Sequence, residues 1–560
     1  MIRREVSADR PIFIFQAQKE NLKNVHSAIP EDILGYTAFL IHVSNYDDST
    51  YESVKSKLDY ADEHGLEIIL EIANFANYEY GYGIMPLEEI RKLYREHTSL
   101  VGVATAELSV AQKEIFAVPG KAKNLIIDLI RVSSESGGLF IWMDMGYLTR
   151  EHVFSIAGED DELYQAIKSN AGNVIIVEKD NGNGKFHLTR SLAAGWWLSG
   201  ACANWGINIE DFLWRSNGYS RLWKESIGWR KPEMIKSIFC YPDTLYAQGI
   251  LTAMSAGAVL YSFEWHNRLI WDGAPASGKR TTPTFDKVVY PFLRKIVSDK
   301  LIPDKEEVRS GVKAVYHATD KRAEELLITG ESLFRGLYGN TYPDSLIREK
   351  KNAMRFLPTT GRYGILPVLP KLTSEEVLSG YDNVIDPVNY PVMFGELSDK
   401  IEYFDKLYPE TYEGSCWAKK VKGRWFVTNP NENVNSSTDF EIEQEGIKIS
   451  GVLHPHSILI AESSTKKTNV YLSNFRSKPG IDWDTPGEID PDEYLNGFVN
   501  EPDLSDIRET EISIKGYTRE PKVELAGDKG VTWEKEWKEP EGMMSIRISH
   551  NCPVEIDIFY

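Results

Sequence analysis

The chain has 560 residues, 42% of them hydrophobic and 11% aromatic, so it can bury the core of a globular protein with two or three domains. Its 83 acidic residues outnumber its 63 basic ones and give a formal net charge of −20. This charge argues against nucleic acid or an anionic membrane as a partner, because both are polyanions, and it favours a neutral or cationic partner.

Segments for targeting, membrane insertion and metal binding are not visible in the sequence. The first residues lack the apolar core of a signal peptide, and no apolar run reaches the roughly 20 residues that a membrane-spanning helix needs. The cysteines form no CxxC pair and have no histidine at ligand spacing, so we expect neither a metal site nor a cofactor. A monomer is expected.

In the first half of the chain, short apolar runs alternate with segments of helical spacing such as Tyr51–His64 and Leu87–His97. Most runs start about 27 to 39 residues apart, the length of a βα unit. The predicted strands are Ile12–Phe15, Phe39–Val43, Ile68–Ile72, Leu100–Ala104, Leu139–Trp142, Val174–Val177, Trp196–Ala201 and Val259–Phe263. Eight such units predict an α/β fold, a closed (β/α)8 TIM barrel that forms a catalytic domain over residues 1–305.

A doubly wound open sheet is the competing interpretation. No GxGxxG follows the first predicted strand, and the glycine-rich Asn181–Gly184 lacks the Lys-Ser/Thr of a phosphate-binding loop. We therefore interpret Asn181–Gly184 as a turn and prefer the barrel.

Residues 306–560 have the pattern of an all-β domain, with short apolar or alternating runs between Gly, Pro, Asn and Asp turns. The predicted strands are Val312–His317, Glu325–Thr329, Arg424–Thr428, Ile447–Leu453, Ile458–Ala461, Val470–Leu472, Glu511–Ile514, Val531–Trp537, Met544–Ile548 and Val554–Tyr560. Strands at this spacing predict a C-terminal β-sandwich.

Acidic and aromatic residues gather where the predicted barrel strands end, which is the catalytic face of such a barrel. The acids are Glu107, Asp144, Glu178, Glu210, Asp211 and Glu264, and the aromatic residues near them are Trp142, Trp205, Trp214 and Trp265. Hydrolysis of a glycosidic bond needs one protonated acid and one carboxylate, and flat rings suit the C–H faces of sugars. The pattern therefore favours a glycosidase.

Each acid also has a structural interpretation. Asp144 and Glu178 are expected to form ion pairs, with Arg150 and with Lys179 or Lys185, and Asp211 to cap a helix. Glu107 and Glu264 are the preferred catalytic pair, because they end the fourth and eighth strands on opposite sides of the barrel. His266 is expected to bind sugar or to be structural rather than to act as a base.

Several segments resemble glycoside hydrolase family 98, in the same order along the chain. Within the barrel they are Val101–Glu107, Gly137–Trp142, Trp205–Trp214 and Val259–Glu264. Beyond it they are Phe292–Arg294, Pro303–Val308, Thr360–Tyr363, Lys406–Pro409, Tyr412–Gly414 and Arg424–Val427. The resemblance covers nearly all of the chain.

The resemblance implies a (β/α)8 catalytic domain with a C-terminal β-sandwich, endo-acting hydrolysis and inversion at the anomeric carbon. It implies that Glu107 is the proton donor and that Glu264 is a glutamate on the side of the base. Glu210 stands where the family has aspartate, so which of Glu210 and Glu264 contacts the nucleophilic water stays open. Asp144 and the four tryptophans are expected to contribute to the sugar site.

The known substrates of the family are blood-group glycans with β-1,4-galactosyl linkages and decorated β-1,4-xylans. The loop after the eighth strand carries Arg268, Trp271 and Arg280, and an arginine pairs well with a uronic acid carboxylate. We therefore expect an endo-β-1,4-xylanase acting on glucuronoarabinoxylan, with an endo-β-1,4-galactosidase releasing blood-group oligosaccharides as the alternative. A secreted, cell-surface or periplasmic location is expected, with a signal peptide outside this chain.

Two further hypotheses stay open. The departure at Glu210 leaves room for a carbohydrate-binding protein without activity on a glycosidase fold. A retaining hydrolase with Glu264 as nucleophile is the other.

Overall fold

The computed structural model describes most of the chain. The described residues are 2–17, 22–43, 45–74, 77, 81–108, 121–144, 153–180, 186–209, 243–264, 269–270, 281–318, 366–385, 402–403, 406–408, 412–414, 416–429, 437–454, 456–475, 507–528 and 530–560.

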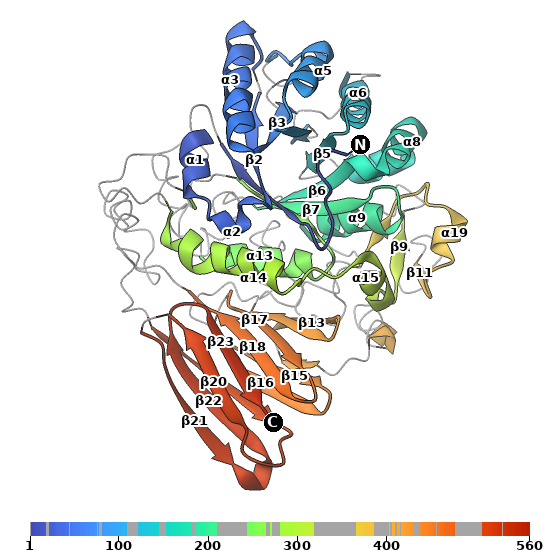
Figure 1. Ribbon diagram of the computed structural model, residues 1–560. Helices are drawn as coiled ribbons and strands as arrows, with labels where there is room; N and C mark the ends of the chain where they lie inside the picture. The colour runs from blue at the N-terminus through green and yellow to red at the C-terminus, as the bar shows by residue number, and fades with distance from the viewer. Residues whose placement is uncertain are drawn as a thin grey trace, which may run out of the picture.

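Eight parallel strands close into a barrel in sequence order, which confirms the predicted fold (Figure 1). They are β1 (Ile12–Gln16), β2 (Thr37–His42), β3 (Glu67–Ala73), β4 (Leu100–Ala106), β5 (Leu139–Asp144), β6 (Val174–Asp180), β7 (Asn204–Ile209) and β8 (Leu260–Phe263). Ile12 of β1 is in register with Leu260 of β8, and this pairing closes the barrel. The strands are buried almost throughout, as expected for a parallel sheet covered by helices.

Helices surround the barrel (Figure 1). They are α1 (Leu22–Ala28), α2 (Glu31–Leu34), α3 (Asp48–His64), α5 (Leu87–Glu96), α6 (Lys121–Glu135), α7 (Val153–Glu159), α8 (Asp161–Ser169), α9 (Phe186–Leu198), α13 (Leu245–Met254), the π-helix η3 (Phe285–Val289) and α14 (Tyr290–Ser298). The two helices predicted from spacing, α3 and α5, are confirmed. Asp47 caps α3 by accepting from the Thr50 N–H, and Gly65 ends it at φ +66°.

The seventh predicted strand is wrong. Trp196–Leu198 is the end of helix α9, and the strand is Asn204–Ile209 instead. The end of α9 is buried from Thr189 to Ser199 because it is covered on both sides, by the barrel and by strand β10 (Val368–Leu369). A helix that is apolar all round has no polar face to reveal its period, so its sequence looks like a buried strand.

The segment after the barrel does not begin the sandwich, contrary to the prediction for Val312–His317. Helix α15 (Lys305–Gly311) leads into β9 (Val315–His317), which pairs in parallel with β10 and with β11 (Val384–Ile385). This small sheet packs on barrel helix α9 through β10. Helix α19 (Glu375–Leu378) lies between β10 and β11 in the sequence. A Cβ at Gly195 of α9 would lie 1.9 Å from the Val368 carbonyl oxygen, so only glycine fits there. The predicted strand Glu325–Thr329 lies outside the described residues.

The C-terminal sandwich is confirmed as two antiparallel six-stranded sheets. One sheet has the order β12-β15-β16-β19-β22-β21 and the other β13-β14-β17-β18-β23-β20. Their bounds are β12 (Tyr412–Gly414), β13 (Trp417–Val421), β14 (Arg424–Thr428), β15 (Thr438–Gln444), β16 (Ile447–Leu453), β17 (Ile458–Ser463), β18 (Lys467–Ser473), β19 (Arg508–Lys515), β20 (Lys522–Gly527), β21 (Thr532–Lys538), β22 (Met543–His550) and β23 (Val554–Phe559).

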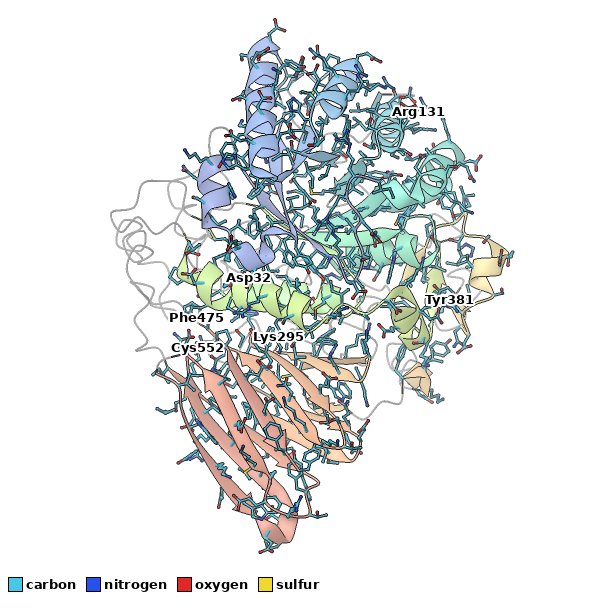
Figure 2. All side chains as sticks on the ribbon, in the orientation of Figure 1. Asp32, Arg131, Lys295, Tyr381, Phe475 and Cys552 are labelled. Atoms are coloured by element: carbon cyan, nitrogen blue, oxygen red, sulfur yellow. The ribbon has the colours of Figure 1, made fainter. Side chains whose placement is uncertain are left out.

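The sandwich packs against the barrel through its second sheet, below helices α13 and α14 (Figure 1). Lys295 of α14 lies at this boundary, between the barrel helices and the sandwich, as Figure 2 shows. Its ammonium is 2.9 Å from Glu555 Oε1 and 5.0 Å from the centre of the Tyr471 ring. Tyr471 and Phe475 belong to the same hydrophobic cluster as the barrel core, so the two parts form one continuous interior.

Candidate active site

Polar side chains line the interior of the barrel where its strands end. Neighbouring parallel strands in register point their side chains to the same face, so the pairing of His42 with Glu71 and of Lys179 with Asn208 places these residues inside. Asn208 in turn pairs with Ser262 of β8, and its amide donates to the Ser262 hydroxyl at 3.0 Å. This polar layer lies at the carboxyl ends of the strands, the end that carries the active site in barrels of this kind.

Glu107 follows directly after β4 in a strained backbone conformation. Its φ is +53°, in the left-handed region that costs a non-glycine residue free energy. The backbone N–H of Glu107 donates to the Met143 carbonyl of β5 at 3.1 Å, which holds the turn. Strain of this kind persists only where the surroundings enforce it, and it aims the Glu107 side chain at the barrel axis.

Glu264 follows directly after β8 and meets Glu107 through Lys179 of β6. The Lys179 Nζ is 3.0 Å from Glu107 Oε1 and also forms an ion pair with Glu264 Oε2. The Lys179 side chain is only 2% exposed, whereas the two glutamates keep 17% and 18% of theirs accessible. The two acids that the sequence singled out therefore share one buried cation and stay open to a ligand.

The environment of Glu107 favours its protonated form. Burial raises the pKa of Glu107, and the nearby carboxylates Glu264 and Glu71 raise it further, while Lys179 opposes them. A raised pKa is the direction of shift that a carboxyl group needs to act as a general acid.

His42 and Glu71 form a second ion pair beside the first. His42 Nδ1 lies 2.9 Å from Glu71 Oε1, and Asn74 donates to the same oxygen at 3.0 Å. Burial opposes charge on both groups, but their mutual attraction wins: the pKa of His42 is raised and that of Glu71 is lowered. Glu264 also raises the pKa of His42, so the two ion pairs belong to one electrostatic network.

Three of the predicted sugar-binding residues are not at this site. Trp205 lies near the opposite end of its strand and donates to the Ala256 carbonyl at 3.2 Å. Trp142 packs edge-on against Phe154 of α7, with ring centroids 5.2 Å apart. Both rings are completely buried, so neither has a face for a sugar. Asp144 is also buried, and its register with Glu178 places it on the helix side of the barrel.

Glu178 forms an ion pair, as predicted, but with a different partner. It accepts from Arg190 Nε of α9 at 2.7 Å, on the helix side of the barrel, whereas the predicted partner Lys185 lies outside the described residues. Burial raises the pKa of Glu178, and Arg190 opposes this shift. The neighbouring Lys179 points the other way because side chains alternate along a strand.

The remaining predicted site residues lie outside the described residues. They are Glu210, Trp214, Trp265, His266 and Arg268, together with Asp211, Arg150, Lys185, Trp271 and Arg280.

Lys179, His42 and Glu71 were missed as site residues by sequence reasoning. A signal was present for Glu71, since a lone carboxylate interrupts the apolar run Ile68–Ala73. A charge inside a buried parallel strand needs a partner, and the partner, His42, ends the preceding strand. Among the described residues no cluster of His, Cys, Asp and Glu has the makings of a metal site.

None of the helices that the structure describes combines the length and apolar character needed to cross a bilayer.

Two family models together cover nearly the whole chain. The one described as "Glycosyl hydrolase family 98" matches residues 1–303, and the one described as "Glycosyl hydrolase family 98 C-terminal domain" matches residues 305–559. Among curated proteins, the chain is 26% identical over 416 residues to a blood-group-substance endo-1,4-beta-galactosidase of Clostridium perfringens. That match covers 71% of this chain and 47% of the relative, so the chain spans about half the length of that protein.

Solved structures with the same fold include the catalytic module of a family 98 glycoside hydrolase from Streptococcus pneumoniae TIGR4. Its complex with the LewisY pentasaccharide blood group antigen matches with a TM-score of 0.81 at 22% identity, over 100% of both chains. Its complex with the H-disaccharide blood group antigen matches over the same extent with a TM-score of 0.80.

Proposed function

The chain belongs to glycosyl hydrolase family 98 and is a glycoside hydrolase, and we propose that it cleaves internal β-1,4-galactosyl linkages in blood-group-type glycans. The observation that carries the catalytic part of the proposal is that Glu107 and Glu264 meet at Lys179 in the mouth of the barrel. The substrate part rests on the relatives: one is named as a blood-group endo-galactosidase, and another was solved with two blood-group oligosaccharides.

This reverses the preference for xylan that the sequence suggested. That preference depended on Arg268 and Arg280, which lie outside the described residues, whereas the relatives reported above that share the family are named for blood-group glycans. Xylan remains the comparison substrate for the experiment.

In the proposed reaction Glu107 is the general acid and Glu264 the general base. Glu107 gives its proton to the glycosidic oxygen while the bond from that oxygen to the anomeric carbon breaks. Glu264 takes a proton from a water molecule, whose oxygen forms the new bond to the anomeric carbon from the opposite face. The products are two shorter glycans with an inverted anomeric centre, and solvent exchange restores both protonation states.

One observation favours a retaining mechanism as the second candidate. Since neither contact to Lys179 exceeds 3.0 Å, Glu107 Oε1 and Glu264 Oε2 are no further apart than about 6 Å, and so short a gap between the facing oxygens is compatible with the roughly 5–5.5 Å between the carboxyl groups of retaining enzymes. Retention would use Glu264 directly as nucleophile, whereas inversion places a water molecule between Glu264 and the anomeric carbon.

Two experiments test the proposal. The protein is incubated with blood-group A, B and H type oligosaccharides and, separately, with glucuronoarabinoxylan, and the products are separated by chromatography. Release of blood-group oligosaccharides is expected; cleavage of xylan alone would overturn the substrate, and binding without cleavage of either would indicate a lectin-like protein for these ligands. Proton NMR of the first-formed anomer then distinguishes inversion from retention.

A location outside the cytoplasm is part of the proposal, because host glycans of this class lie outside cells. Fractionation of the producing cells, with the protein detected by antibody, tests it.

A further inference from the structure

Lys179 is the one cation that the described residues place between the two catalytic glutamates. On strand β6 the side chains of two adjacent charged residues point to opposite faces. Glu178 pairs with Arg190 on the helix side, and Lys179 points into the barrel. An ammonium that is 98% buried would be very costly without charged partners, and Glu107 and Glu264 supply them.

Among the described residues, the charges around Lys179 come from four other strands. His42 ends β2, Glu71 lies in β3, Glu107 follows β4 and Glu264 follows β8. On the inner side of β7 Lys179 has Asn208 in register, which is polar but uncharged. Asp144 and Glu178 on β5 and β6 belong to the helix side. Within the part of the barrel that the structure describes, the carboxyl groups of Glu71, Glu107 and Glu264 therefore face the cations Lys179 and His42, and His42 is already engaged by Glu71.

The reaction moves negative charge from one glutamate to the other. Before it, Glu264 is a carboxylate and Glu107 holds a proton; as the glycosidic bond breaks, Glu107 becomes the carboxylate and Glu264 gains a proton. Lys179 contacts both glutamates, so one of its partners is a carboxylate before and after the reaction. The Lys179 ammonium can therefore stabilise the negative charge on either glutamate without changing its position.

We propose that Lys179 is a positioning residue of this hydrolase, the shared counter-ion that holds Glu107 and Glu264 in place and balances their charge in both protonation states. This inference rests on the proposed function for the roles of the two glutamates. It also assigns a function to a lysine for which the sequence suggested only an ion pair with the adjacent Glu178.

The test compares Lys179→Met, which keeps much of the side-chain volume and removes the charge, with Lys179→Arg, which keeps the charge. Loss of the cation favours the protonated form of each glutamate, so both limbs of the pH profile of kcat/KM are expected to move to higher pH, by about one unit or more. At the wild-type optimum kcat is expected to fall at least tenfold with a smaller change in KM. Lys179→Arg is expected to keep the limbs at the wild-type pH even if its rate is lower.

Glu178→Gln is the matched control, because it breaks a buried ion pair one residue away on the opposite face of the same strand. It is expected to lower the melting temperature without moving the pH profile. If Lys179→Met only loses stability, as Glu178→Gln does, or if it raises KM alone with unmoved limbs, Lys179 is structural or binds substrate, and the proposal is overturned.

A measurement without turnover separates this inference from the proposed function. In protein labelled with ¹³C at the glutamate carboxyl carbons, the Glu107 signal is assigned by its loss in Glu107→Gln. Its titration midpoint is expected to rise in Lys179→Met, whatever glycan the enzyme cleaves. An unmoved midpoint would overturn the role of Lys179, while absence of glycan cleavage by the wild type would overturn only the proposed function.

Discussion

His456 of the sandwich forms a hydrogen bond with Gln248 of barrel helix α13, with 2.7 Å between Nδ1 and Oε1. Because an amide oxygen only accepts, Nδ1 carries the proton and donates. The side-chain amide nitrogen of Gln248 donates to the Asn429 carbonyl at 3.3 Å, and the His456 backbone N–H donates to the same carbonyl at 3.0 Å. His456 is buried and has φ +59°, a strained value that this interface maintains.

Replacing His456 with alanine should weaken the attachment of the sandwich to the barrel. The substitution leaves the buried Gln248 oxygen without its donor, which costs about 1–3 kcal/mol. We expect a lower midpoint in chemical denaturation, followed by intrinsic fluorescence. His64→Ala, at an exposed position at the end of helix α3, is the control; an equal loss in both variants would contradict a specific role for His456.

The same histidine should make stability depend on pH. Burial, helped by the nearby charge of Arg508, lowers the pKa of His456 to about 3 from its usual 6.5. Between these two pH values the unfolded chain binds the proton and the folded one does not, so folding stability falls as pH falls through this range. Melting temperatures at pH 7, 6, 5 and 4 should decrease less steeply for His456→Gln than for the wild type.

His550 adds to this trend for the same reason. Burial lowers its pKa to about 4, and only the Cys552 carbonyl, which accepts from the ring, opposes the shift. A His456→Gln protein should therefore keep part of the acid sensitivity. Identical pH curves for the wild type and the variant would show that other groups control it.

Glu107→Gln and Glu264→Gln should each reduce kcat by about 10²–10⁴-fold, as expected for loss of a positioned general acid or base. Glutamine has nearly the same shape, so the barrel should stay folded, as circular dichroism can verify. For Glu107→Gln, a substrate with a good leaving group such as a nitrophenolate should lose much less activity, since that leaving group needs no proton. Near-normal turnover of the natural linkage by either variant would remove that residue from the site.

Gly195→Ala should be destabilising out of proportion to one methyl group. The added Cβ would overlap the Val368 carbonyl oxygen, so α9 and β10 must move apart, and overpacking of this kind costs typically about 1–3 kcal/mol or more. Gly35→Ala is the matched control, because nothing lies within 4 Å of its added Cβ and its φ of −65° suits alanine. Thermal unfolding of both variants gives the comparison; equal melting temperatures would contradict the close packing.

The sequence by itself determined the barrel, the sandwich and the two central acids. Apolar runs at βα spacing predict strands that close into a barrel, and an acid directly after the fourth and the eighth run must lie at the same end of it, because all strands are parallel. Glu107 and Glu264 could therefore be named without coordinates. Local pattern was sufficient because these properties depend only on the order and spacing of residues.

Only the tertiary structure decided which side each residue faces and what it meets there. Glu178 and Lys179 are neighbours of opposite charge, and the sequence suggests that they pair with each other or with nearby residues; closure of the barrel instead brings Glu178 to Arg190 and Lys179 to Glu107 and Glu264. For the same reason Trp142, which was expected to bind sugar, lies in the hydrophobic core, and the end of α9 was predicted to be a strand. Alternation along a strand defines two faces, but contacts between residues distant in sequence determine which face is the interior.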